Sequence, residues 1–162
     1  MFRAIVVGTD GSATASEAVR RAGALADAFG ADLHVVNAYR TPALVLASAA
    51  EPGGVPGCVF EWEAAARDDS CELLEAVARD LVGVGDSVTT YAVSAHPATA
   101  LLAVAEEVGA DLIVVGNRGM KGPRRVLGSI PNHISHHAPC DVLVVDTVDT
   151  VDTVGTAGGA LV

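Results

Sequence analysis

Short apolar runs that end at glycine restrict the possible folds of this chain more than any other feature. Residues 4–7 (AIVV) lead into Gly8, and residues 112–115 (LIVV) lead into Gly116. Apolar runs without polar alternation are typical of strands that are buried on both faces, as in parallel sheets covered by helices. Between these runs, apolar residues recur at spacings of three and four, which indicates amphipathic helices. The alternation predicts an α/β fold.

Strands and helices are expected to alternate along the whole chain. The predicted strands are residues 4–7, 33–39, 87–93, 112–115 and 142–145, and the predicted helices are residues 13–29, 62–82, 97–108 and 131–137. A repeated strand–helix–strand order implies parallel strands joined by right-handed crossovers. We therefore predict a single domain with an open, parallel, five-stranded sheet and helices on both faces.

Local signals mark the ends of two helices. Thr14 and Glu17 have the spacing of a capping box at the start of the first helix, and Gly30 is expected to stop it. Pro97 and Gly109 are expected to begin and end the helix at residues 97–108.

Two segments do not follow the alternation of strands and helices. Residues 40–57 are rich in proline and glycine, and we interpret them either as a surface connection or as a flap over a ligand. From residue 146 the chain repeats Asp-Thr-Val and then becomes glycine-rich, which leaves too little apolar surface to offset the entropy of ordering. We predict a domain over residues 1–147 and a low-complexity, disordered tail over residues 148–162.

The residue composition and net charge of the chain exclude some classes of binding partner. The 162 residues carry a net charge of −10 and are 51% hydrophobic but only 4% aromatic, so the core is expected to consist of Val, Leu, Ile and Ala. This charge argues against a nucleic-acid-binding face. No apolar run reaches the roughly 20 residues of a membrane helix, and no secretory segment precedes Asp10. The three cysteines form no Cys-x-x-Cys pair, which suits reduced thiols, and we predict a cytoplasmic protein.

Positive charge is concentrated in one glycine-rich segment. Residues 112–140 contain Arg118, Lys121, Arg124 and Arg125 but no Asp or Glu, which gives +4 in a chain whose net charge is −10. Glycine turns let backbone N–H groups approach an anion, and a helix N-terminus carries about half a positive charge. The segment therefore predicts a phosphate-binding loop.

Two turns are placed to form a ligand site. Residues 8–12 (GTDGS) follow the first strand, and residues 116–119 (GNRG) follow the fourth. Gly128 and Ser129 then open the next helix, where Ser129 is expected to act as the N-cap and to supply a hydroxyl donor. Ligands of open parallel sheets bind outside the carboxyl ends of the strands. If the first and fourth strands are neighbours, both turns line one cleft.

These motifs resemble the universal stress protein family. The resemblance covers residues 2–147 and rests on residues 6–12 (VVGTDGS), 114–119 (VVGNRG), 128–129 (GS) and 141–145 (DVLVV) in their order and spacing. It implies a Rossmann-like sheet with the strand order 3-2-1-4-5 and a homodimer formed through the last strand, Asp141 to Val145. In one branch of the family it also implies ATP or another adenine nucleotide, with or without Mg, in the cleft.

The resemblance assigns roles to individual residues. Asp10 would approach the nucleotide or a metal bound with it, the backbone around Ala38 would meet the adenine, and the glycine-rich turn would surround the ribose and phosphates. The nucleotide-binding residues expected on this basis are Gly8, Thr9, Asp10, Gly11, Ser12, Ala38, Gly116, Asn117, Arg118, Gly119, Gly128, Ser129 and Ile130. Eight residues separate Gly119 from Gly128, one fewer than in the family's ATP-binding pattern, so triphosphate binding is a separate question from the fold.

Two functions stay open at this point. The first is a regulatory stress protein that binds an adenine nucleotide, and the second is a non-nucleotide-binding member that acts as a dimeric protein-interaction module. Catalysis beyond slow hydrolysis of bound ATP is not expected, because no nucleophile with an adjacent base is recognisable. His133 and His137 have a metal-like spacing, but histidines at a helix end are more simply explained by the helix dipole, and no metal site is predicted. Cys58 and Cys71 are interpreted as ordinary thiols.

Overall fold

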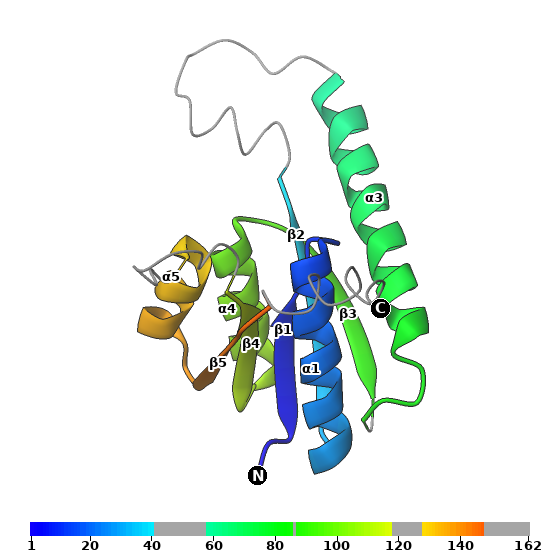
Figure 1. The fold of residues 1–162 in the computed structure, drawn as a ribbon. Coiled ribbons are helices and arrows are strands. Elements are labelled where there is room, and N and C mark those ends of the chain that lie inside the picture. The colour runs from blue at the N-terminus through cyan, green and yellow to red at the C-terminus, as the bar shows by residue number, and fades with distance from the viewer. Residues whose placement is uncertain (41–57, 86, 118–127, 148–162) are drawn as a thin grey trace, which may run out of the picture.

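The computed structural model describes residues 1–40, 58–85, 87–117 and 128–147. Five parallel strands form one sheet in the order β3-β2-β1-β4-β5 (Figure 1). The strands are β1 (Ala4–Gly8), β2 (Asp32–Tyr39), β3 (Val88–Ser94), β4 (Leu112–Gly116) and β5 (Asp141–Val145). The predicted fold class and strand order are confirmed. The predictions for residues 41–57 and 148–162 lie outside the described residues.

Strand β1 occupies the centre of the sheet, and the chain reverses its direction of winding there. Val7 is in register with Val35 of β2 on one side and with Val114 of β4 on the other. The chain therefore first winds outward through β2 and β3, and then returns to the other side of β1 as β4. The turns after β1 and β4 diverge at this point, which is where open α/β sheets bind their ligands.

In the described residues, four helices cover the sheet in two layers. They are α1 (Ala13–Phe29), α3 (Cys58–Asp80), α4 (Pro97–Val108) and α5 (Ser129–His137). Helices α1 and α3 lie over one face, and α4 and α5 lie over the other (Figure 1). In the described part of the chain, no helix combines the length and apolar character needed to cross a membrane.

Each face of the sheet has its own apolar core of small and branched side chains. Ile5 and Val7 belong to the core beneath α1 and α3, which also contains Ala22. Val6, which lies between them in β1, belongs instead to the core beneath α4 and α5, together with Leu101. Because alternate side chains of a strand point to opposite faces, an unbroken apolar run is the sequence that a strand covered on both faces requires.

Helix α1 has the predicted bounds, but its N-terminus is capped differently from the prediction. Ser12 is its N-cap, and the Ser12 hydroxyl accepts a hydrogen bond of 3.3 Å from the backbone N–H three residues later. The expected capping box of Thr14 and Glu17 is wrong, because the Glu17 carboxylate binds the side chains of Arg20 and Arg21 at 2.7 Å. Hydrogen bonds from these two guanidinium groups lower the pKa of Glu17 to about 2. The glycine stop is confirmed, since the residue after α1 has φ 60°.

Two helices begin earlier than the sequence pattern predicts. Helix α3 starts at Cys58 and not at residue 62, and α5 starts at Ser129 and not at residue 131. Pro131 suggested the later start of α5, but proline is tolerated throughout the first turn, where N–H groups have no partner within the helix. The N-cap of α5 is Gly128, so the expected capping role of Ser129 is wrong.

Asp111 ties the start of β1 to the start of β4. Its carboxylate accepts hydrogen bonds from the backbone N–H groups of Arg3, at 2.7 Å, and Ala4, at 3.2 Å. The Asp111 backbone N–H in turn donates to the Ala4 carbonyl at 2.9 Å. The two backbone donors, first that of Arg3, lower the pKa of the Asp111 carboxyl because they stabilise its charged form.

The Asp111 contact predicts acid sensitivity of the fold. A carboxyl whose pKa is lower in the folded state stabilises the fold fully above its unfolded value of about 3.9, and this stabilisation is lost as the pH falls through the folded pKa. Asp111→Asn should therefore lower the urea midpoint of unfolding at pH 7. Below about pH 4, the urea midpoint of this variant should fall less steeply with decreasing pH than that of wild type. Asp69→Asn, on the exposed face of α3, is the control. Equal pH slopes for wild type and Asp111→Asn would contradict this assignment.

Candidate functional site

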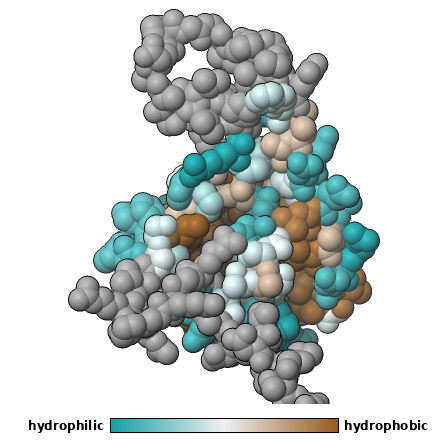
Figure 2. Space-filling model, turned by 45° about the horizontal axis from the view of Figure 1, so that its top comes forward, coloured by the Kyte–Doolittle hydropathy of each residue, from teal (hydrophilic) through white to brown (hydrophobic). Residues whose placement is uncertain are grey.

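A cavity opens at the carboxyl ends of β1 and β4, where the chain reverses its winding. The described residues line a volume of about 240 Å³, just below the range of roughly 300–1,000 Å³ for small-molecule sites. Apolar surface is visible between polar side chains when this end of the molecule is turned forward (Figure 2). The position is the one expected from the sheet topology.

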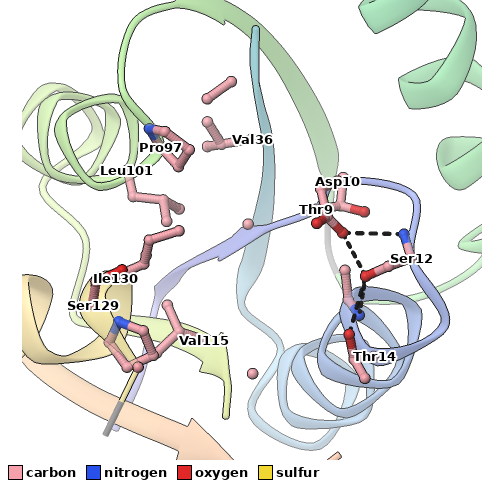
Figure 3. Close-up of a pocket in the computed structure, with 16 residues that line it drawn as sticks. Thr9, Asp10, Ser12, Thr14, Val36, Pro97, Leu101, Val115, Ser129 and Ile130 are labelled. Atoms are coloured by element: carbon pink, nitrogen blue, oxygen red, sulfur yellow. Dashed lines mark hydrogen bonds between the residues drawn. The ribbon is translucent and has the colours of Figure 1, made fainter. Parts of the chain in front are cut away.

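One wall of the cavity is apolar. Val36 and Ala38 contribute from β2, and Leu101 contributes from α4 (Figure 3). Ile130, from the first turn of α5, lies on the same side as Leu101 in the view of Figure 3. Such a wall suits a flat, weakly polar ring system, because ring burial removes apolar surface from water.

The opposite wall is polar and is built by the turn from β1 into α1. Asp10 accepts hydrogen bonds at one carboxylate oxygen from the Ser12 hydroxyl, at 2.5 Å, and from the Ser12 backbone N–H, at 3.1 Å. Thr14 continues the chain of hydroxyl groups, with its Oγ1 3.0 Å from the Ser12 Oγ. Figure 3 shows these side chains across the cavity from the apolar wall. Hydroxyl and carboxylate groups can bind sugar hydroxyls, which are both donors and acceptors.

Two glycines stand at the strand ends that border the cavity. A Cβ atom at Gly8 would lie 3.0 Å from Cδ1 of Leu101, and one at Gly116 would lie 3.3 Å from Cγ2 of Thr147. Both glycines line the cavity, and Leu101, which a Cβ at Gly8 would meet, lines it as well. The close contacts explain why glycine suits both strand ends.

The structure brings most of the expected ligand-binding residues together. Nine of them line the cavity: Gly8, Thr9, Asp10, Ser12, Ala38, Gly116, Gly128, Ser129 and Ile130. Gly11 and Asn117 are not among the lining residues. Arg118 and Gly119 lie outside the described residues, as do the other basic residues of the loop.

Asn117 is engaged at the end of β5. The Asn117 Oδ1 accepts hydrogen bonds from the backbone N–H of Thr147, at 3.0 Å, and from its hydroxyl, at 3.1 Å. The Asn117 amino group donates to Asp146 at 2.9 Å, and its backbone N–H donates to the carbonyl of Val145 at 3.0 Å. Asn117 is only 4% exposed. Its side chain therefore joins the ends of β4 and β5.

Gly11 also has a structural role. Its φ of 75° lies in the left-handed region, and a Cβ there would lie 3.1 Å from Cδ1 of Leu73 in α3. Glycine is favoured in this conformation because it has no Cβ to clash with the backbone. The second glycine of the GTDGS turn thus allows both the turn and the close approach of α3.

A buried polar pair behind the turn was missed by the sequence analysis. The amino group of Asn37 in β2 donates to the carbonyl of Thr9 at 2.7 Å, and the hydroxyl of Ser70 in α3 donates to the Asn37 Oδ1 at 2.6 Å. Asn37 is 7% exposed and Ser70 is 4% exposed. One signal was available, because the asparagine interrupts the apolar second half of β2 next to the predicted site. Its partner on a distant helix had no such signal.

The histidines and cysteines do not form a reactive centre in the described residues. The rings of His133 and His137 stack with centroids 4.2 Å apart, but no group of three or more His, Cys, Asp or Glu side chains is arranged there to hold a metal. Cys71 and Cys140 are free thiols. Burial raises the pKa of the Cys140 thiol, and nearby carboxylates raise it further, which disfavours the nucleophilic thiolate.

The fold and the cavity define a doubly wound α/β protein with a pocket at its topological switch point. Comparison with known proteins gives its family. The model of the universal stress protein family matches residues 1–146, and the chain belongs to that family. The resemblance deduced from the two turns and the last strand is confirmed.

Several relatives match along nearly their whole length. Universal stress protein Rv1636 of Mycobacterium tuberculosis is 34% identical over 156 residues, which cover 90% of this chain and 97% of the relative. A solved universal stress protein in complex with cAMP is 33% identical, with a TM-score of 0.58 over 90% of this chain and 98% of that one. Hypothetical protein MJ0577 has a TM-score of 0.71 at 21% identity, covering 90% of this chain and 96% of that one, and shows the fold alone.

Proposed function

We propose that this universal stress protein binds an adenine nucleotide and acts as a regulator in the stress response. The observation that carries the proposal is the cavity at the switch point, with an apolar wall opposite a wall of hydroxyl and carboxylate groups. The relative in complex with cAMP supports an adenine nucleotide as the ligand class. The acid-free basic segment, residues 112–140, supports an anionic group on that ligand.

The lining residues fit the parts of such a ligand. The apolar wall around Ala38 and Leu101 would hold the adenine, and the hydroxyl groups at Ser12 and Ser129 would face the ribose or a phosphate. Gly116 and Gly128 leave the backbone close to the cavity, as a phosphate requires. Asp10 is the lining carboxylate that could hold a Mg ion brought with the nucleotide.

Adenine nucleotides should raise the melting temperature of the purified protein. A ligand present at 100 times its Kd stabilises the folded state by about 2.7 kcal/mol. For a domain of this size, each kcal/mol corresponds to roughly 2–4 °C, so the shift should be roughly 5–10 °C. Scanning fluorimetry with cAMP, AMP and ATP, the last with and without Mg, is the measurement.

The matched control for each adenine nucleotide is the guanine nucleotide that carries the same phosphate group. Calorimetry should then show heat with at least one adenine nucleotide and a weaker response to its guanine counterpart. If none of the adenine nucleotides at millimolar concentration changes either the melting temperature or the heat, the proposed function is wrong.

We also propose that the protein forms a homodimer through β5, which is the basis of the alternative function as a protein-interaction module. In the described sheet β5 is an edge strand, paired with β4 on one side. Leu143 in this strand is 38% exposed, and its neighbours Val142 and Val144 are only partly buried. An apolar edge strand has backbone groups ready to pair with another chain. A second copy of β5 would cover these groups.

Leu143→Lys should convert the dimer into a monomer in sedimentation experiments at micromolar concentration. The change places a charge in the centre of the proposed interface, where an unpaired charge would be desolvated. Val82→Lys is the control, because it introduces the same charge at an apolar residue that is 83% exposed and lies away from β5. A wild-type monomer, or a dimer that survives Leu143→Lys, would contradict the β5 interface.

A further inference from the structure

Helix α3 contacts the turn between β1 and α1 at two points. Ser70 reaches it through Asn37, which binds the carbonyl of Thr9. Leu73, one turn further along α3, packs directly against Gly11. Residues three apart lie on the same face of a helix, so one face of α3 supports the turn from the side opposite the cavity.

The hydrogen bonds that join Ser70, Asn37 and Thr9 fix the orientation of these buried groups. Thr9, Asn37 and Ser70 are all at most 7% exposed. The Ser70 hydroxyl donates to the Asn37 Oδ1, so the amide is oriented with its amino group toward Thr9. Without that hydroxyl, a buried carbonyl oxygen would lose its donor, which is costly in the low-dielectric interior.

Thr9 transmits this support to the residues that line the cavity. Its backbone N–H donates to the carbonyl of Val36 at 2.9 Å, and its Oγ1 accepts from the backbone N–H of Gly11 at 3.3 Å. Asp10 lies between Thr9 and Gly11 and lines the cavity with Ser12. A shift of the Thr9 carbonyl would therefore move the polar wall.

We propose that Ser70 is a positioning residue for the nucleotide site: through Asn37 it holds the turn of Thr9, Asp10 and Gly11 in the geometry that the ligand requires. This inference rests on the proposed function, and it makes α3 the element through which the polar wall is adjusted. Ser70 does not line the cavity, so it would act on affinity through the turn alone.

The first measurement is hydrogen exchange on the ligand-free protein. Ser70→Ala should accelerate exchange at the amides of Thr9, Gly11 and Ser12 by about fivefold or more, because each of these amides donates a hydrogen bond within or beside the turn. Leu74→Val is the matched control: it removes buried apolar volume from the same helix but touches no polar group of the pair. In the control, the exchange rates of these three amides should change no more than the change in global stability requires.

The second measurement is affinity for cAMP and ATP by calorimetry, under conditions in which every variant is folded. Ser70→Ala should bind about five- to tenfold more weakly than wild type, and Ser70→Thr should restore affinity because it keeps the hydroxyl donor. Unchanged affinity in Ser70→Ala, or turn amides that respond no more than in Leu74→Val, would overturn the inference. If Ser70→Ala exchanges faster at the turn but wild type binds no nucleotide, the positioning role is supported and the proposed function is refuted.

Discussion

Gly8→Ala is expected to weaken adenine-nucleotide binding roughly 10- to 100-fold. The added methyl group would lie 3.0 Å from Cδ1 and 3.4 Å from Cδ2 of Leu101, closer than these atoms normally approach. Leu101 also lines the cavity, so both the new methyl group and the displaced side chain would take volume from the ligand site. If the lost ligand space costs the complex about 1.4–2.8 kcal/mol of binding free energy, affinity falls about 10- to 100-fold. Calorimetry with cAMP and ATP measures the effect.

Gly23→Ala provides a matched control for this steric change. A Cβ at Gly23 would lie 3.2 Å from side-chain atoms of both Leu81 and Val84, on the α1 face of the sheet. This variant also adds one methyl group against apolar side chains, and Gly23 does not line the cavity. We expect its affinity to equal that of wild type. If Gly8→Ala binds as tightly as Gly23→Ala, the cavity between β1 and α4 is not where the nucleotide binds.

Asn117→Ala is expected to lower the free energy of unfolding by about 2–4 kcal/mol. The change removes two hydrogen bonds from Thr147 to the Asn117 Oδ1 and one from the Asn117 amino group to Asp146. The backbone N–H of Thr147 would be left without its acceptor, and Thr147 is only 2% exposed. A buried donor without a partner costs about 1–3 kcal/mol, in addition to the lost bonds. Urea unfolding at pH 7 gives the value.

Asn132→Ala is the control for the loss of an asparagine amide. Asn132 is exposed in α5, where surface substitutions usually change stability by less than about 0.5 kcal/mol. The structural role of Asn117 also predicts that Asn117→Ala loosens the end of β5, and with it the proposed dimer. An Asn117→Ala protein as stable as Asn132→Ala would contradict this role.

Local, repeated signals in the sequence predicted the structure best. Apolar runs predicted β1, β4 and β5, because a strand covered on both faces can contain few polar side chains. Glycine at the end of α1 and proline at the start of α4 marked helix ends for backbone reasons that need no tertiary contact. The capping box at Thr14 and Glu17 was wrong because Ser12 caps the helix and the arginines one turn later bind Glu17.

The candidate site was predicted in position but only partly in residue roles. The GTDGS and GNRG motifs pointed to one edge of the sheet, and Asp10 and Gly116 both line the cavity there. Gly11 and Asn117 belong to the same motifs, but Gly11 packs against α3 and Asn117 is hydrogen-bonded at the end of β5. Adjacent residues of a turn point in different directions, so a motif alone does not reveal which of its side chains faces a ligand.

Apolar periodicity and turn glycines in the sequence alone determined the sheet and the edge at which its cavity opens, and a family resemblance in the sequence implied the strand order. The strands and the turns at their ends follow from contacts between near neighbours or from backbone geometry, whereas the strand order was implied by the resemblance alone. Only the tertiary structure decided that Ser70 supports the Thr9 carbonyl through Asn37, and that Asn117 joins β4 to β5. Such contacts join residues about 30 positions apart, and their partners are selected by the packing of whole helices and strands, which no local pattern encodes.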